Sequence, residues 1–172
     1  MARAVAYPYT FEMLYKIQFT GPVRGHHVYK DNWAPFIGEQ LTCRPDSREE
    51  ALTYDKFALG VYKSTEGGII LVGHVPIELS QLLNYFLTTG EQRNNLMAEV
   101  TGKRKREIGL VVPVKYTAIT DNKLFAQVLL EKLEEKKKII GIDITESKLK
   151  KLPCFVKVNN ESEEKETEKK ES

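Results

Sequence analysis

Hydrophobic and polar residues follow two periods along the chain, and they predict a series of short strands with two helices among them. Alternating or continuous apolar runs predict strands at 11–19, 40–44, 56–63, 68–75, 96–102 and 109–117. Apolar residues recur at i, i+3, i+4 and i+7 within 77–87 and again along 122–139, which is the spacing of one helical face. Gly21 and Pro22 are expected to break the first strand, which 23–28 then resumes.

Residue chemistry at the segment ends supports these boundaries. The glycine-rich turn at 64–68 is typical of a hairpin, and the continuous apolar run after it predicts a strand covered on both faces. A short helical turn is expected at 47–52, within a polar connection. Pro76 suits the first turn of a helix, and Asp121 is expected to cap the second helix. The apolar stripe predicted for that helix comprises Leu124, Phe125, Val128, Leu129 and Leu133.

The order of these patterns predicts a mainly-β fold with α-helices, namely a small antiparallel β-barrel with two packed helices. One domain is expected over residues 1–140. Residues 141–158 form a C-terminal extension of ambiguous pattern, in which 154–158 resembles a last strand. Residues 159–172 contain no apolar side chain, so we expect a disordered acidic tail.

The charge is unevenly distributed along the 172 residues, which carry a net charge of +2. The tail holds six acids and three lysines, so the rest of the chain has 23 basic and 18 acidic residues. This balance excludes a histone-like polycation. No apolar run approaches the ~20 residues of a membrane span, and the N-terminus lacks a signal-peptide pattern, so we expect a soluble intracellular protein. Cys43 and Cys154 are expected to be buried thiols.

Known catalytic and metal-binding motifs are absent from the sequence. There is no phosphate-binding loop, dinucleotide fingerprint, nucleophile elbow or zinc-protease motif. The two cysteines and three histidines do not have the spacing of a structural zinc site. The sequence therefore predicts a protein that is not an enzyme and that needs no metal or other cofactor.

The segment 25–33, GHHVYKDNW, gathers aromatic and cationic residues. Tyr29 beside Lys30 could stack a base and hold a phosphate, because aromatic faces and cations are what single-stranded nucleic acids bind. The alternative is that Val28 and Trp33 belong to the core and that the two histidines lie in a solvated loop.

A second candidate consists of Tyr54, Asp55 and Lys56, followed by His74 in the sequence GHVP. A tyrosine and an aspartate that enter a strand can place an aromatic face and a hydrogen-bond acceptor at the rim of a barrel. An aspartate accepts a hydrogen bond from a sugar hydroxyl and repels phosphate. The pair therefore favours the terminus of a nucleic acid over its phosphate backbone. The alternative is a turn-capping aspartate beside a packed tyrosine.

The third candidate is a run of four basic residues on an expected hairpin tip: Lys103, Arg104, Lys105 and Arg106. Such a run can contact phosphates or serve as a nuclear-import signal. A solvated turn without a partner is the alternative.

Four segments, at 24–44, 53–63, 70–87 and 99–114, together resemble a HIRAN domain over roughly residues 12–130. The most specific parts are DKFA (55–58) and GHVP (73–76), whose spacing agrees with the family. The turn before DKFA is longer than usual and lacks the Asn-Pro of the family. The resemblance implies an OB- or SH3-like antiparallel barrel that binds DNA, in the best-understood members at the 3′ end of a single strand.

By position, Tyr54 and Asp55 match the family's pair at the terminal nucleotide and its 3′-hydroxyl. Tyr29 and Lys30 fall near a basic-aromatic pair, and His74 follows the family's strand glycine. The leading hypothesis is a non-catalytic module of the nucleus, or otherwise of the cytoplasm, that binds single-stranded DNA or DNA 3′ ends and no membrane. Tyr29 and Tyr54 would then stack on bases.

In that hypothesis Lys30, Lys56 and the basic run at 103–106 would meet phosphates, and Asp55 would accept from the terminal hydroxyl. The alternative hypothesis is a protein-interaction adaptor, whose barrel groove binds a peptide and whose basic run is an import signal. Basic and aromatic residues on one face would favour DNA, and an exposed apolar groove would favour a peptide.

Overall fold

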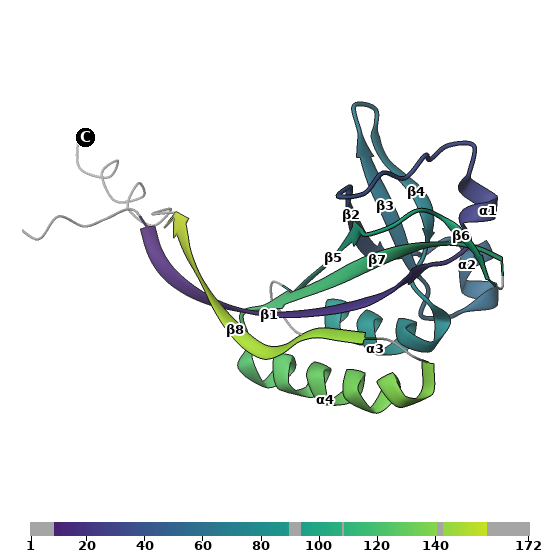
Figure 1. Ribbon diagram of the computed structural model, residues 1–172. Coiled ribbons are helices and arrows are strands. Elements are labelled where there is room, and N and C mark those ends of the chain that lie inside the picture. Colours follow the sequence, from purple (N-terminus) through teal and green to yellow (C-terminus); the bar gives the residue numbers. More distant parts are fainter. Residues whose placement is uncertain (1–8, 90–93, 108, 141–142, 158–172) are drawn as a thin grey trace, which may run out of the picture.

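The computed structural model describes residues 9–89, 94–107, 109–140 and 143–157, and it confirms a mainly-β fold with helices. The elements in chain order are β1 (Tyr9–Val23), α1 (His26–Tyr29), β2 (Gln40–Pro45), α2 (Glu49–Tyr54), β3 (Leu59–Thr65), β4 (Gly68–His74), α3 (Ile77–Thr88), β5 (Asn95–Val100), β6 (Lys105–Glu107), β7 (Gly109–Thr120), α4 (Lys123–Ile140) and β8 (Asp143–Lys157). Figure 1 shows a curved sheet with α3 and α4 together on one face, while α1 and α2 lie at one end.

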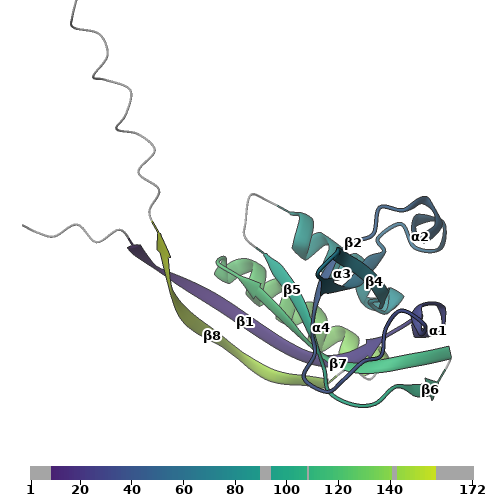
Figure 2. The same cartoon turned by 90° about the horizontal axis from the view of Figure 1, so that it is seen from above.

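The sheet is antiparallel and open, which corrects the prediction of a closed barrel. Its order is β4-β3-β2-β5-β7-β1-β8, and β6 pairs with β7 outside this path. β8 occupies the outer edge of β1 from Tyr9 to Thr20, and the two strands continue as an arm away from the body (Figures 1 and 2). Only the segment after Thr20 is left to approach β4. There a single bridge joins Arg24 to His74.

The bridge depends on a glycine in the GHVP segment. The amides of Arg24 and His74 donate to each other's carbonyl oxygens, both at 2.9 Å. A Cβ atom on Gly73 would lie 2.7 Å from the Arg24 carbonyl oxygen and would collide with the side chain of Val23. The close approach of β1 and β4 therefore requires a residue without a side chain at this position.

The helical face predicted for 77–87 is confirmed. Leu79, Leu83 and Phe86 of α3 are buried in the core between helix and sheet, and Leu82 is partly buried against it. These positions follow the helical period, so one side of α3 is buried and the other faces solvent.

The apolar stripe of α4 differs from the one predicted. Leu129 and Leu133 are buried as expected, but Leu124 and Val128 are exposed and Ala126 is buried instead. A stripe of five apolar residues is wider than the contact surface, and packing against β8, α3, β1 and β7 selects one side of it. The cap prediction was also wrong, because Asn122 rather than Asp121 accepts a hydrogen bond from the Phe125 amide, at 3.1 Å.

Gly21 and Pro22 do not break β1, which runs through them to Val23. Beyond Thr20 the strand pairs only with β7, so the missing amide of Pro22 lies where a strand edge tolerates it. The chain then turns at Gly25, whose φ is +79°, and forms α1 where a resumed strand was expected.

The hairpin of β3 and β4 is confirmed, with two differences. β3 begins at Leu59 rather than at residue 56. β4 is an edge strand whose first residues are exposed, so the continuous apolar run did not indicate cover on both faces. An apolar run does not distinguish an edge strand from a central strand, because an edge strand can also bury apolar side chains on one face of the sheet.

The remaining sequence expectations concern the cysteines and the C-terminus. Cys43 is a buried free thiol, and burial raises its pKa to about 12. The side chain of Cys154 and the tail at 159–172 lie outside what the structure describes. Most of the ambiguous extension is β8, which pairs along β1 and so extends the same sheet.

Candidate functional site

A pocket of about 480 Å³ lies where three of the segments identified from the sequence meet. Its walls come from 24–28 at the end of β1 and the start of α1, from 51–59 around α2, and from 74–77 between β4 and α3. The bridge between Arg24 and His74 holds the first and third segments together. The volume is within the ~300–1,000 Å³ of typical ligand sites.

A buried carboxylate stands behind the pocket wall and organises its polar groups. Asp46 is 2% exposed, and its Oδ2 atom lies 2.7 Å from Nε2 of His74, which lines the pocket. Arg48 donates to both carboxylate oxygens of Asp46 at 3.0 Å, through Nε and NH2. The same NH2 group donates to the hydroxyl of Tyr29 at 3.3 Å. Asp46 therefore links its loop neighbour Arg48 to His74 of β4 and, through Arg48, to Tyr29 of α1.

The electrostatics of this network keep Asp46 ionised. Burial by itself would raise the pKa of Asp46, but the hydrogen bonds from Arg48 and His74 outweigh it and hold the pKa at about 2. The hydrogen bonds to Asp46 and Tyr29 in turn raise the pKa of Arg48. An ionised carboxylate can only accept, so Nε2 of His74 carries the proton that it donates to Asp46. The orientation and tautomer of His74 are thereby fixed.

Tyr54 and Asp55, predicted from the sequence, both line this pocket together with His74. Tyr54 is the last residue of α2 and is 88% exposed, which leaves its ring available to a partner. Oδ1 of Asp55 accepts from the amide of Phe57 at 2.9 Å. Asp55 therefore caps the turn into β3, as the alternative reading expected, and also faces the pocket.

The other aromatic and cationic candidates are not gathered at the pocket. Tyr29 is half-buried, with its ring 6.3 Å from that of His74 and its hydroxyl held by Arg48. Lys30 is exposed beyond the end of α1. Lys56 places its ammonium 5.1 Å from the ring centroid of Phe57. Tyr29 thus supports the pocket wall from behind, and neither lysine lines the pocket.

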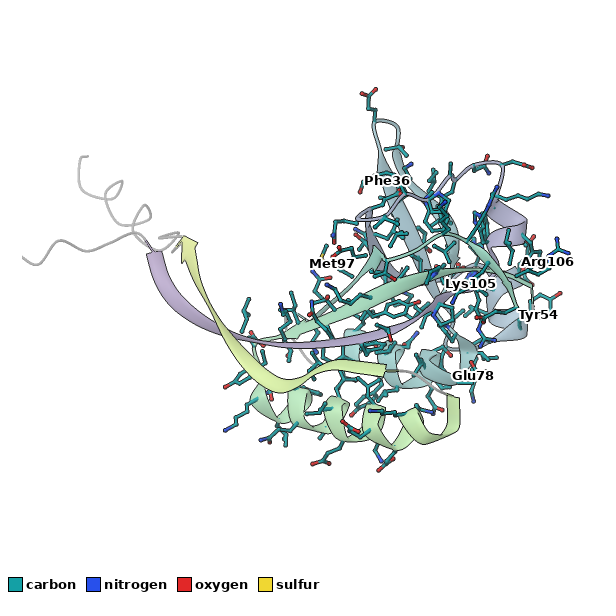
Figure 3. The ribbon with its side chains drawn as sticks, viewed as in Figure 1. Phe36, Tyr54, Glu78, Met97, Lys105 and Arg106 are labelled. Atoms are coloured by element: carbon teal, nitrogen blue, oxygen red, sulfur yellow. The ribbon has the colours of Figure 1, made fainter. Side chains whose placement is uncertain are left out.

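The basic run is exposed, but it does not lie at the predicted hairpin tip, because the turn between β6 and β7 follows Glu107. Lys105 and Arg106 lie on β6, which pairs back onto β7. Figure 3 shows both side chains at the same end of the body as Tyr54, and Figure 2 places β6, α1 and α2 at that end as well. Lys103 and Arg104 line a hollow with 34–35, and Lys105 lines another with Arg24.

Arg24, Asp46 and Arg48 were missed by sequence reasoning. Arg24 lines both the pocket and the hollow that contains Lys105, so it connects the two. It immediately precedes the candidate segment 25–33 and begins the segment 24–44 that carries the resemblance, and these two positions were the available signals. Asp46 and Arg48 lie in the polar connection of 44–55, which contains several charged residues, and no sequence pattern distinguishes these two from the others.

Trp33 and His26 belong to the core rather than to the surface. Nε1 of Trp33 donates to the buried Glu39 at 3.0 Å, so its indole is unavailable for stacking on a ligand. His26 is fully buried, and its ring meets that of Trp33 edge-on at 5.2 Å between centroids. Val28, by contrast, is 64% exposed and lines the pocket. The alternative that both residues belong to the core therefore holds for Trp33 and not for Val28.

His26 predicts that the protein loses stability in mild acid. Burial, Arg104 and His27 lower its pKa below the ordinary 6.5. The unfolded chain therefore takes up this proton first, so stability is complete above pH 6.5 and falls as the pH drops below it. Thermal melts between pH 8 and pH 5 should show this loss in the parent protein. The loss should be smaller in His26→Leu, and an equal loss in both would contradict the assignment.

No group of three or more potential metal ligands occurs within the described part of the chain. Within the same residues, no helix is long and apolar enough to cross a membrane. No protein-family model, curated protein or solved structure matches this chain.

Proposed function

We propose that this chain is a HIRAN-like, non-catalytic module that binds the end of single-stranded DNA. The observation that carries the proposal is the convergence of Tyr54, Asp55 and His74 on one pocket, with Arg24 linking that pocket to the basic run. These segments are far apart in the sequence and are the ones that carry the resemblance.

The pocket has the chemistry that a terminal nucleotide needs. Its apolar walls can enclose a sugar and base, and the exposed ring of Tyr54 can stack on the base. Arg24 and the run from Lys103 to Arg106 supply cations for the phosphates that follow. Among the lining residues that the structure describes, Asp55 is the only carboxylate, and it would accept from a 3′-hydroxyl. We further propose a nuclear location, because the same run fits an import signal. The distribution of a fluorescent fusion protein between nucleus and cytoplasm would test this location.

Asp55→Asn is the sharpest test of end recognition, because asparagine can still cap the Phe57 amide while removing the negative charge. Fluorescence anisotropy should show that the protein binds a 3′-hydroxyl oligonucleotide roughly ten-fold more tightly than its 3′-phosphate, since hydrogen bonds to charged groups contribute about 1.5–3 kcal/mol. Asp55→Asn should bring the two affinities together. Tyr54→Ala should weaken both by roughly ten-fold, because stacking does not read the end group.

An unchanged ratio of the two affinities in folded Asp55→Asn would confine Asp55 to its capping role. Blunt duplex DNA serves as the control ligand, and it should bind more weakly than either single strand. Equal binding of duplex and single strands would remove the end-binding proposal altogether.

A second candidate function is a protein-interaction adaptor that uses the same pocket. It is favoured by the exposed apolar side chains at the rim, of which Val28 is 64% and Ile77 is 57% exposed. Exposed apolar residues gathered at one concavity are typical of a protein contact. A peptide that competes with the oligonucleotide for the pocket would support this function, and failure of every single strand to bind would leave it as the better candidate.

A further inference from the structure

A second groove runs between α3 and α4, away from the pocket described above. Its volume is about 570 Å³. Its floor includes Phe57 and Leu82, and its sides carry Tyr85 of α3 and Val128 of α4. Tyr85 is 60% and Val128 is 41% exposed, so both present apolar surface to solvent. Figure 1 shows the two helices side by side on one face of the sheet.

The groove combines this apolar floor with a basic rim. Lys132 and Lys136 line it and lie one turn apart on α4. Its remaining lining residues are neutral, and no carboxylate is among those that the structure describes. Lys56, whose ammonium is 5.1 Å from the ring centroid of Phe57, adds a third cation beside the floor. The ammonium of Lys132 donates to Glu135 of the same helix at 3.3 Å, and Glu135 does not line the groove.

We propose that this groove docks an acidic amphipathic helix from another protein. Two helices packed side by side present a channel into which a third helix can lay its apolar face, with anchors at i, i+3 or i+4, and i+7. The anchors would contact Leu82, Tyr85 and Val128, and glutamates or aspartates beside them would meet Lys132 and Lys136. The basic rim selects an acidic helix and disfavours a basic one.

The chain's own acidic tail is the wrong occupant on chemical grounds. Residues 159–172 carry six acids but no apolar side chain, so they could meet the lysines without filling the floor. The groove is also a different surface from the pocket at α1 and α2, and no residue lines both. The inference therefore stands whether or not the pocket binds DNA.

A display selection with the full chain as bait and random 16-residue peptides as probes tests the proposal. The enriched peptides should carry apolar residues at helical spacing with acidic residues between them. Their affinities, measured by anisotropy, should fall at least five-fold in Lys132→Glu/Lys136→Glu and in Tyr85→Ala. They should remain within two-fold of the parent protein in two controls: Lys123→Glu, an exposed charge reversal on the same helix, and Ile69→Ala, an exposed apolar truncation on β4.

Three results would overturn the proposal. One is the enrichment of no peptide, or of neutral or basic peptides only. Another is peptide affinity that is unchanged in the groove variants, or displacement of the bound peptide by a single-stranded oligonucleotide. Either result would show that the peptides bind outside this groove. The third is a gain of ten-fold or more on deletion of 159–172, which would make the tail the resident occupant. Thermal melts within a few degrees of the parent would confirm that the variants are folded.

Discussion

Asp46→Ala is expected to lower the free energy of unfolding by about 2–4 kcal/mol, because it removes the shared acceptor of Arg48 and His74. Each charged hydrogen bond contributes roughly 1.5–3 kcal/mol. The total should stay below the simple sum, because the side chains of Arg48 and His74 are 49% and 27% exposed and water can rehydrate both. Urea denaturation measures the loss, which corresponds to a fall in Tm of roughly 5–15 °C.

The acid dependence of this variant provides a second readout. The pKa of Asp46 is about 2 in the folded protein against an ordinary value of 3.8. A carboxyl whose pKa is lowered by folding contributes stability above pH 4, and the contribution disappears as the pH falls towards 2. The protein should therefore lose about 2 kcal/mol more than Asp46→Ala over that interval. The matched control is Asp31→Ala, which removes an exposed aspartate. This variant should have the Tm of the parent protein and should lose the same stability between pH 4 and pH 2.

If Asp46→Ala melts within 2 °C of the parent protein, the network does not hold the pocket together. A variant that is destabilised but binds single-stranded DNA as before would instead show that the network supports the fold without shaping the site. Reduced affinity at a temperature where the variant is folded would connect the network to binding, through the orientation of His74.

Replacing Lys103, Arg104, Lys105 and Arg106 by alanine should weaken binding of single-stranded DNA by roughly a hundred-fold or more near 0.1 M salt. Each phosphate contact that is lost flattens the dependence of log affinity on log salt by about 0.7, so four contacts would remove nearly 3 from the slope. The four side chains are exposed, so stability should hardly change. Anisotropy titrations at several salt concentrations measure affinity and slope together.

The matched control for this variant is Lys132→Ala/Lys136→Ala, which removes two cations from the helical groove rather than from the pocket side. Its affinity for single strands and its salt slope should equal those of the parent. If the four-alanine variant also leaves affinity and slope unchanged, the run is not part of a DNA interface. Its remaining role would then be nuclear import.

Local pattern was sufficient for most of the secondary structure. The face of α3 was predictable because Leu79, Leu83 and Phe86 recur with the period of a helix, and periodicity reports which side of an element is buried. The hairpin of β3 and β4 was predictable from its glycine-rich turn. Tyr54 and Asp55 could be singled out because an aromatic and an acceptor are adjacent in the chain, and they do line one pocket.

Tertiary structure decided what depends on contacts between distant segments. Asp46 meets His74 across 28 residues, and nothing around either one distinguishes an ion pair from a solvated charge. Pro22 continues β1 only because β8 stops pairing at Thr20 and leaves that stretch at an edge. A sequence pattern records the preference of a residue relative to its own helix or strand axis. Which other element packs against that helix or strand, and which charged side chains it contributes, is decided only by the tertiary fold.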